Sequence, residues 1–165
     1  MIPTVACIGL GGNLGDVART LAGALVALDA LPGSRLLRAS RVYRTPAWGR
    51  RDQPDFLNAA ALLDTRLAPR ELLLELLAVE QRFGRERDAG AGGRWGPRTL
   101  DLDLLLYGEA SVEEPGLRIP HPHLHERAFV LVPLAEIAPE ASIPGHGRVR
   151  EALDGLDTAG IEAIP

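Results

Sequence analysis

The sequence contains no lysine, because all 18 of its basic residues are arginine. A Walker-type nucleotide site needs the lysine of its Gly-Lys-Ser/Thr segment, so this class of ATP site is excluded. The same absence excludes kinase-fold chemistry, which places a lysine on the phosphates, and any Schiff-base mechanism. If this chain handles phosphate, arginine side chains and metal ions have to neutralise the charge.

Cysteine and long apolar runs are also scarce. Cys7 is the only cysteine, which rules out an internal disulfide and a cysteine metal cluster. The most apolar stretch, Leu21 to Leu28, is too short to cross a membrane, and no secretory signal stands at the N-terminus. The formal net charge of -4 gives no basic footprint for nucleic acid. We therefore expect one cytoplasmic domain, residues 1–165, with no membrane and no nucleic-acid partner.

A charged turn and the strand that follows it carry the clearest chemical pattern. The segment from Arg94 to Asp103 contains a glycine-proline turn and then alternates polar with apolar residues, as a half-buried strand does. Asp101 and Asp103 then share one face, and Arg94 and Arg98 flank them. Two adjacent carboxylates favour Mg²⁺, and guanidinium groups suit phosphate. A strand with one solvated, charged face explains the same alternation, so spacing alone leaves both interpretations open.

Apolar periodicity predicts six elements in the order strand, helix, strand, strand, helix, strand. They are Thr4 to Leu10, an amphipathic helix between Asp16 and Pro32, Leu36 to Tyr43, Phe56 to Leu63, a helix from Pro69 to Gly84, and Arg98 to Tyr107. This order is the split β-α-β arrangement of a ferredoxin-like sheet. The expected fold class is α+β, with a ferredoxin-like antiparallel sheet covered by helices in α/β/α layers.

The remaining segments are expected to form turns, an interrupted apolar segment and one short helix. The glycines at 11, 12 and 15 predict a tight strand-to-helix turn rather than a dinucleotide fingerprint, whose third glycine is missing. Residues 108–116 are expected to form a polar turn. Residues 128–137 are an apolar segment that we expect Pro133 to break. A short helical piece is expected near residues 149–156.

Several polar side chains allow two interpretations on chain evidence alone. Asn58 shares a strand face with Phe56, and it is either a hydrogen-bonded structural amide or a ligand contact. Arg85 and Arg87 lie in a glycine-rich segment, which is either a solvated basic loop or a lid that closes over a polyphosphate. The histidines at 121, 123 and 125 lie in a run that two prolines keep extended, and this does not suggest a metal site, although His121 alone suits a phosphate hydrogen bond.

Four motifs, in order, give the chain a family resemblance. They are Tyr43-Arg44-Thr45-Pro46, Gln53 to Ala59, Arg94 to Asp103, and Pro120-His121 together with Arg127 and Phe129. Over essentially its whole length the chain resembles the 6-hydroxymethyl-7,8-dihydropterin pyrophosphokinases of folate biosynthesis. The resemblance implies an ATP-dependent diphosphotransferase that moves the β,γ-pyrophosphate of ATP to the pterin hydroxymethyl group and releases AMP. It also implies two Mg²⁺ ions as cofactors, and a monomer whose partners are ATP and the pterin.

The same resemblance implies roles for individual residues. The metal-binding pair would be Asp101 and Asp103, and the other catalytic residues would be Arg85, Arg94, Trp95 and Arg98. The pterin would contact Thr45, Pro46, Phe56, Asn58 and Phe129, with the two phenylalanine rings stacked on its faces. ATP would contact Glu80, Arg87, Arg98, His121 and Arg127.

The residue types agree with this chemistry. A flat, polar pterin needs two ring faces and one bidentate amide, and phosphoryl-type transfer needs positioning and charge neutralisation. No dedicated general base stands out, so an aspartate of the pair or water would accept the hydroxyl proton. Two rival functions remain: a regulatory module that binds a small ligand without catalysis, and a D-x-D transferase or nucleotide hydrolase with another acceptor.

Overall fold

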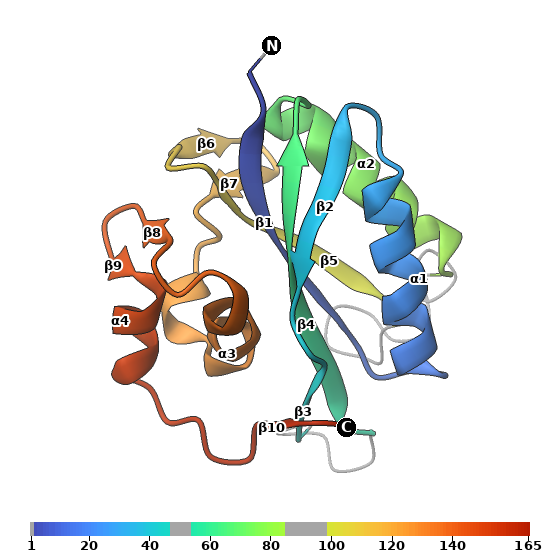
Figure 1. Cartoon of the computed structure of the whole chain (residues 1–165), viewed down its shortest axis with the longest axis vertical. Helices are drawn as coiled ribbons and strands as arrows, with labels where there is room; N and C mark the ends of the chain where they lie inside the picture. Colours follow the sequence, from blue (N-terminus) through green and yellow to red (C-terminus); the bar gives the residue numbers. More distant parts are fainter. Residues whose placement is uncertain (1, 47–53, 85–98) are drawn as a thin grey trace.

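A computed structural model describes residues 2–46, 54–84 and 99–165 of the chain. Its main sheet is antiparallel and follows the order β10-β3-β4-β1-β5, with β2 also paired to β4 (Figure 1). The strands are β1 (Thr4–Gly12), β2 (Ser34–Ala39), β3 (Tyr43–Thr45), β4 (Phe56–Thr65), β5 (Asp101–Tyr107) and β10 (Glu162–Ala163). The central order β5-β1-β4-β2 is that of a ferredoxin-like sheet, so the predicted fold class is confirmed.

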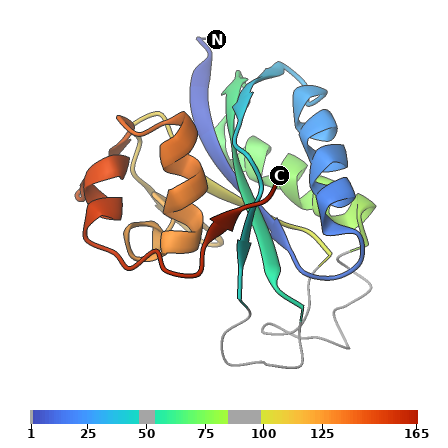
Figure 2. The same cartoon turned by 60° about the horizontal axis from the view of Figure 1, so that its bottom comes forward.

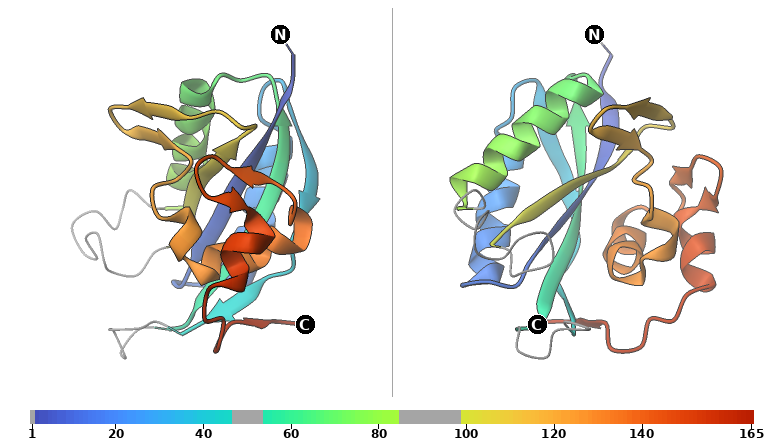
Figure 3. Two further views of the ribbon diagram at one scale, coloured as in Figure 1. Left: turned by 90° about the vertical axis from the view of Figure 1, so that its left-hand side faces the viewer. Right: turned by 180° about the vertical axis from the view of Figure 1, so that it is seen from behind.

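Helices cover both faces of this sheet, as Figures 1 and 3 show. One face packs against α1 (Val17–Asp29) and α2 (Pro69–Arg82), through a core that includes Ile8, Leu63 and Leu104. The other face packs against η2 (Leu124–Glu126), α3 (Ala128–Ile137) and α4 (Val149–Asp154), through a second core. The result is the expected α/β/α layering.

Local sequence features explain where the first two helices begin and end. The Asp16 side chain accepts a hydrogen bond from the Arg19 amide at 3.3 Å, which caps the N-terminus of α1. Pro69 occupies the first turn of α2, where no intrahelical N–H is needed. Gly84 follows that helix with a φ of +91°, a conformation that favours glycine.

The prediction that Pro133 breaks the segment at 128–137 is wrong, because α3 runs through it. A proline removes the one intrahelical hydrogen bond to the carbonyl four residues before it. Leu131, Leu134 and Ile137 are each at most 4% exposed, and this burial of apolar surface on the sheet outweighs one lost bond.

Several short strands differ from the predicted pattern. The expected strand at 36–43 divides into β2 and β3, and the strand expected from Arg98 begins at Asp101. The expected polar turn contains β6 (Val112–Glu114), which forms a hairpin with β7 (Leu117–Ile119). A second small hairpin joins β8 (Ser142–Ile143) to β9 (Gly147–Arg148), where the His146 ring stacks on His125 with centroids 3.7 Å apart.

The C-terminal segment returns to the main sheet. After α4 the chain crosses the end of the helical layer, and β10 pairs with β3 (Figures 1 and 2). The Ile164 amide also donates a 2.9 Å hydrogen bond to the Val42 carbonyl. Within the described residues, no helix has the length and apolar composition that a membrane crossing requires.

Candidate active site

Two rows of cross-strand neighbours form the floor of the site, on the sheet face that carries α3. In the first row, Asp101 of β5 lies opposite Gly11 of β1, and Gly11 lies opposite Asn58 of β4. In the second row, Asp103 lies opposite Gly9. The alternation predicted for β5 is observed, since the two aspartates are half-buried on this face while Leu102 and Leu104 are buried on the other. The carboxylates therefore stand beside strand positions that carry no side chain.

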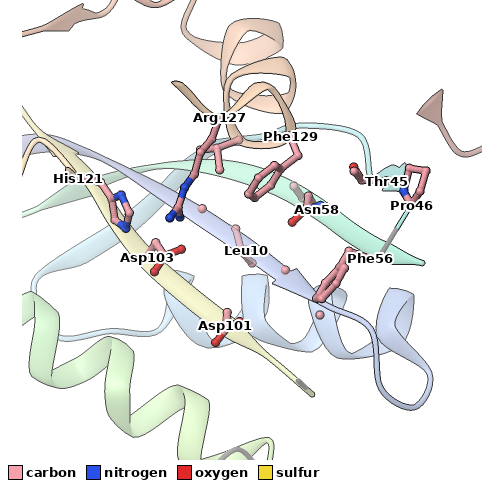
Figure 4. A pocket seen from close by; sticks show the side chains of 15 residues that line it. Leu10, Thr45, Pro46, Phe56, Asn58, Asp101, Asp103, His121, Arg127 and Phe129 are labelled. Carbon is pink, nitrogen blue, oxygen red and sulfur yellow. The ribbon is translucent and has the colours of Figure 1, made fainter. Parts of the chain in front are cut away.

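Above these rows lies a cavity of about 540 Å³, shown in Figure 4. The four strands that line it, β3, β4, β1 and β5, are consecutive neighbours in the sheet, and the helical layer contributes the opposite wall. The lining consists of Gly9, Leu10, Gly11, Gly12, Thr45, Pro46, Phe56, Asn58, Ala59, Asp101, Asp103, His121, Arg127, Phe129 and Val130. A cavity of this size accommodates a small heterocycle or part of a nucleotide.

One end of the cavity combines aromatic rings with unsatisfied polar atoms. Phe56 comes from β4 and Phe129 from the first turn of α3, and in Figure 4 their rings lie on either side of the Asn58 side chain. The Asn58 Nδ2 and Thr45 Oγ1 atoms are buried and make no hydrogen bond within the described part of the chain. Buried polar groups are nearly always paired, so two unpaired ones in a cavity indicate a polar, planar ligand.

The other end of the cavity is charged. Arg127, at the N-cap of α3, and His121 lie on the same side of the cavity as Asp103 in Figure 4, and the Arg127 guanidinium is 6.0 Å from the Phe129 ring centre. Burial lowers the pKa of His121 below 6.5, Asp103 acts in the opposite direction, and Arg127 and His123 lower the pKa further. The imidazole is therefore mainly neutral at pH 7 and offers one donor and one acceptor nitrogen.

A buried carboxylate supports the aspartate strand from behind. Glu80 of α2 is only 4% exposed, and its Oε2 atom accepts a hydrogen bond from the Leu102 amide at 2.6 Å. Among the described strands β5 lies at the edge of the sheet, so none of them pairs with this amide on its outer side. Glu80 does not line the cavity, although the family resemblance implied an ATP contact for it.

A second network ties α3 to the strands beside the cavity. The Tyr43 hydroxyl donates to Glu136 Oε1 at 2.5 Å, and the Arg41 backbone and side chain donate to the same carboxylate, each at 3.1 Å. Burial alone raises the pKa of Glu136, but these hydrogen bonds and the Arg41 charge outweigh it, so the pKa lies below 4.5. Glu136 and Phe129 are on one helix, so the network also sets the position of the aromatic wall.

The structure brings together nine of the predicted site residues in one cavity. They are Thr45, Pro46, Phe56, Asn58, Asp101, Asp103, His121, Arg127 and Phe129. Five other predicted residues lie outside the described part of the chain: Arg85, Arg87, Arg94, Trp95 and Arg98.

Sequence reasoning missed the contribution of β1 to the cavity. Gly11 and Gly12 were expected in a turn, but both belong to β1 and line the cavity with Gly9 and Leu10. The missed indication was glycine inside an otherwise apolar strand pattern, which marks a close approach of another group to the backbone. Val130 of α3 was also missed, and nothing in its apolar sequence context distinguishes it.

Comparisons with known proteins agree with this geometry. The sequence profile of the 7,8-dihydro-6-hydroxymethylpterin-pyrophosphokinase (HPPK) family matches residues 7–139. Two bacterial proteins named 2-amino-4-hydroxy-6-hydroxymethyldihydropteridine pyrophosphokinase are similar throughout. The Methylorubrum extorquens protein is 52% identical over 98% of this chain and 99% of its own length. The Pseudomonas aeruginosa protein is 45% identical over 96% of this chain and 95% of its own.

Solved structures agree on the fold. A Plasmodium falciparum HPPK-DHPS crystallised with pteroate matches with a TM-score of 0.70 and 11% identity, over 98% of this chain and 46% of that chain. A second HPPK-DHPS structure, in complex with substrates, matches with a TM-score of 0.69 over 93% of this chain and 43% of that one. This chain therefore spans less than half of those larger chains. The profile match and the identities to the bacterial proteins show that the chain belongs to the 7,8-dihydro-6-hydroxymethylpterin-pyrophosphokinase family.

Proposed function

We propose that this protein transfers the β,γ-pyrophosphate of ATP to the hydroxymethyl group of 6-hydroxymethyl-7,8-dihydropterin, giving the pterin diphosphate and AMP. The observation that carries the proposal is the row Asp101, Gly11, Asn58 across three strands, with a carboxylate pair at one end and an unsatisfied amide between two phenylalanine rings at the other. The names of the similar bacterial proteins support the same reaction.

The aromatic end of the cavity is the proposed pterin pocket. Phe56 and Phe129 would stack on the two faces of the ring, an arrangement that suits flat heterocycles. The Asn58 side chain offers both a donor and an acceptor, so it can read the amide-like edge of a pterin. Thr45 and Pro46 would close the pocket, and a ligand acceptor at this point would satisfy the Thr45 hydroxyl.

Two Mg²⁺ ions are the proposed cofactors. Asp101 and Asp103 fit this role because hard carboxylate oxygens stand side by side on the cavity face, and Mg²⁺ is usually held by one or two carboxylates plus substrate phosphates. When bound, the ions supply positive charge that neutralises the triphosphate and orients its β-phosphorus.

Because the chain has no lysine, the triphosphate would be held by arginine and histidine side chains. Among the described residues, Arg127 and the neutral His121 are suitably placed in the cavity. From the family resemblance we assign the remaining contacts to Arg85, Arg87, Arg94, Trp95 and Arg98. We further propose that the protein is a monomer and that it is located in the cytoplasm.

The proposed reaction is a displacement at the β-phosphorus of ATP. The pterin hydroxymethyl oxygen forms a bond to that phosphorus, the bond between it and the α,β-bridging oxygen breaks, and AMP leaves with the bonding electrons. The hydroxyl proton passes to a carboxylate oxygen of the aspartate pair or to water. The protein contributes alignment of the two substrates and charge neutralisation, which are the main needs of such a transfer.

The product distribution tests this proposal. We would follow ³¹P NMR of the protein with MgATP, with and without 6-hydroxymethyl-7,8-dihydropterin. Pterin-dependent AMP together with a new diphosphate ester is expected. ADP would indicate an ordinary kinase, pterin-independent loss of ATP would indicate a hydrolase, and unchanged ATP in both samples would favour the binding module.

Substitution of the aspartates tests the metal assignment. Asp101→Asn and Asp103→Asn should each lower kcat on the order of 10²–10³-fold or more, because charge stabilisation in the transition state is lost. Asp154→Asn, on the exposed outer side of α4, is the matched control and should leave the rate unchanged. Near-normal rates in the Asp101 and Asp103 variants would contradict the assignment.

A further inference from the structure

Gly11 occupies the centre of the row that joins the two ends of the cavity. It is the cross-strand neighbour of Asp101 on one side and of Asn58 on the other. Neighbouring strands are about 4.8 Å apart, so a ligand that spans from the carboxylate to the amide crosses roughly 10 Å and passes directly over Gly11. The backbone at this position therefore forms the floor beneath the ligand.

Glycine is required here by lack of space rather than by backbone conformation. The φ of Gly11 is not positive, so any residue could adopt this strand geometry. A Cβ atom at Gly11, however, would lie 2.6 Å from Asn58 Oδ1 and 3.7 Å from Asn58 Cγ. Carbon and oxygen atoms that are not bonded do not approach within about 3 Å without repulsion, so the Asn58 amide would have to move.

The Asn58 amide is free to move if it is pushed. Its Nδ2 atom is buried but has no hydrogen-bond partner among residues 2–46, 54–84 and 99–165, so none of these residues resists rotation of the amide group through that atom. The orientation of the amide therefore depends on packing, and its oxygen lies directly beside the position that a Cβ atom at Gly11 would occupy. A single methyl group at Gly11 would redirect the amide without unfolding the sheet.

We propose that Gly11 is a specificity-determining positioning residue, which keeps the Asn58 amide directed at the edge of a planar heterocycle. This inference rests on the proposed function, because the heterocycle is the pterin assigned to this pocket. It predicts that a side chain at Gly11 weakens pterin recognition through Asn58 and not through the metal or the triphosphate.

Gly9 provides a comparison on the same strand and the same face. The three atoms nearest to a Cβ at Gly9 would all belong to the Leu105 side chain, the first of them Cδ1 at 3.3 Å, and that flexible end can shift. Gly9 also lines the cavity and lies opposite Asp103, so Gly9→Ala adds an equal methyl group without touching Asn58. A general effect of crowding the cavity would appear in both variants.

A double-mutant cycle measures the coupling between Gly11 and Asn58. We would determine Kd for the pterin and for MgATP, by calorimetry, in the wild type, Gly11→Ala, Asn58→Ala and the double variant. Gly11→Ala should raise the pterin Kd about 10- to 100-fold, the effect of losing one or two hydrogen bonds, and should change the ATP Kd less than about threefold. In the Asn58→Ala background, Gly11→Ala should raise the pterin Kd by a further factor of less than about three.

A ligand-free measurement separates failure of this inference from failure of the proposed function. The chain has only two asparagines, Asn13 and Asn58, so the side-chain amide resonances in a ¹⁵N NMR spectrum are few. Gly11→Ala should shift the Asn58 resonance, whereas Gly9→Ala should leave it in place. An unshifted resonance, or an equal loss of pterin affinity with and without Asn58, would overturn the inference. A wild-type protein that binds no pterin would instead refute the proposed function.

Discussion

The Leu102 amide donates a hydrogen bond of 2.6 Å to the Glu80 carboxylate, and Leu102 is the residue between the two aspartates of β5. The bond ties the exposed edge of that strand to α2, which is packed on the opposite face of the sheet from the cavity. We therefore expect Glu80 to act as a positioning residue, because its hydrogen bond holds the backbone from which Asp101 and Asp103 project, although Glu80 does not line the cavity.

Removal of this support should disturb metal binding more than substrate binding. Glu80→Ala is expected to lower kcat about 10- to 100-fold and to raise the Mg²⁺ concentration that gives half-maximal rate, because a hydrogen bond to a charged group contributes about 1.5–3 kcal/mol. Glu80→Gln keeps an acceptor oxygen and should recover part of the loss. The measurement is a Mg²⁺ titration of the initial rate at saturating pterin.

Glu75→Gln is the control for this prediction, since Glu75 lies on the same helix and is partly exposed. It should leave the Mg²⁺ dependence unchanged. If Glu80→Ala changed only thermal stability, with a normal Mg²⁺ dependence, Glu80 would have a structural role and not a positioning role.

Features that depend on short-range geometry could be predicted from the sequence. The alternation from Leu100 to Leu104 predicted the faces of β5 correctly, because a strand has a period of two whatever surrounds it. The N-cap at Asp16 and the helix start at Pro69 depend on the same kind of short-range geometry. These features, together with the order of elements, were sufficient for the fold.

Other features depend on contacts between distant parts of the chain. The crowding at Gly11 exists only because Asn58 lies opposite on β4, and no pattern around residue 11 encodes that register. Pro133 remains helical because its neighbours are buried on the sheet. Most of the cavity residues were predicted from motifs, whereas the glycine floor beneath them required the pairing of the strands.

The hydrogen bonds to Glu136 predict that the packing of α3 beside the proposed pterin pocket loses stability at acid pH. The pKa of Glu136 is lower in the folded chain than the ordinary 4.5, so the unfolded chain binds the proton more readily as the pH falls. The contribution of Glu136 to stability is therefore complete above pH 4.5 and is lost as the pH falls below that value. Urea unfolding between pH 3 and 7 should show a shallower pH dependence for Glu136→Gln than for the wild type.

Tyr43→Phe tests the link between this network and the pocket. The variant loses the hydroxyl that donates to Glu136, so the free energy of unfolding should fall by about 1 kcal/mol. Because Glu136 and Phe129 share α3, the KM for the pterin should rise severalfold while the KM for ATP stays constant. Equal changes in both KM values would show that the network does not act on the pterin pocket.

Cys7 should be unreactive in the folded protein. Burial raises the pKa of its thiol from 9.0 to about 12, so the thiolate that reacts with disulfide reagents is almost absent at pH 8. A chromogenic disulfide reagent should therefore label the native protein at the rate of its unfolding, and the denatured protein within seconds. Rapid labelling of one thiol per native chain would contradict the burial.

The raised pKa of the Cys7 thiol also affects the stability of the protein at high pH. Between pH 9 and about 12 the unfolded chain releases the Cys7 proton while the folded chain retains it, so the free energy of unfolding falls as the pH rises. The expected loss is about 1.4 kcal/mol for each pH unit in that interval. Cys7→Ala lacks the ionisable group, and the difference between the two urea-unfolding curves at pH 8 and pH 10 isolates its contribution.

The pairing of β10 with β3 predicts that the C-terminal segment supports the pterin pocket. β3 ends at Thr45, a wall residue, and its outer edge is covered by β10, with the Ile164 amide donating to the Val42 carbonyl at 2.9 Å. Gly160 also approaches Pro46, since a Cβ there would be 3.7 Å from the proline ring. Ile164→Pro removes the donating amide, whereas Ile164→Ala keeps it and serves as the matched control.

Ile164→Pro should raise the KM for the pterin about 3- to 10-fold, the effect of one hydrogen bond on the geometry of β3, with little change in the KM for ATP. Deletion of residues 158–165 removes the whole strand and should have a larger effect in the same direction. The proposed ATP end of the cavity is lined by Asp101 and Asp103 of β5 and by Arg127, whereas β10 pairs with β3. If deletion left the pterin KM unchanged, β3 would hold Thr45 and Pro46 in place through β4 alone.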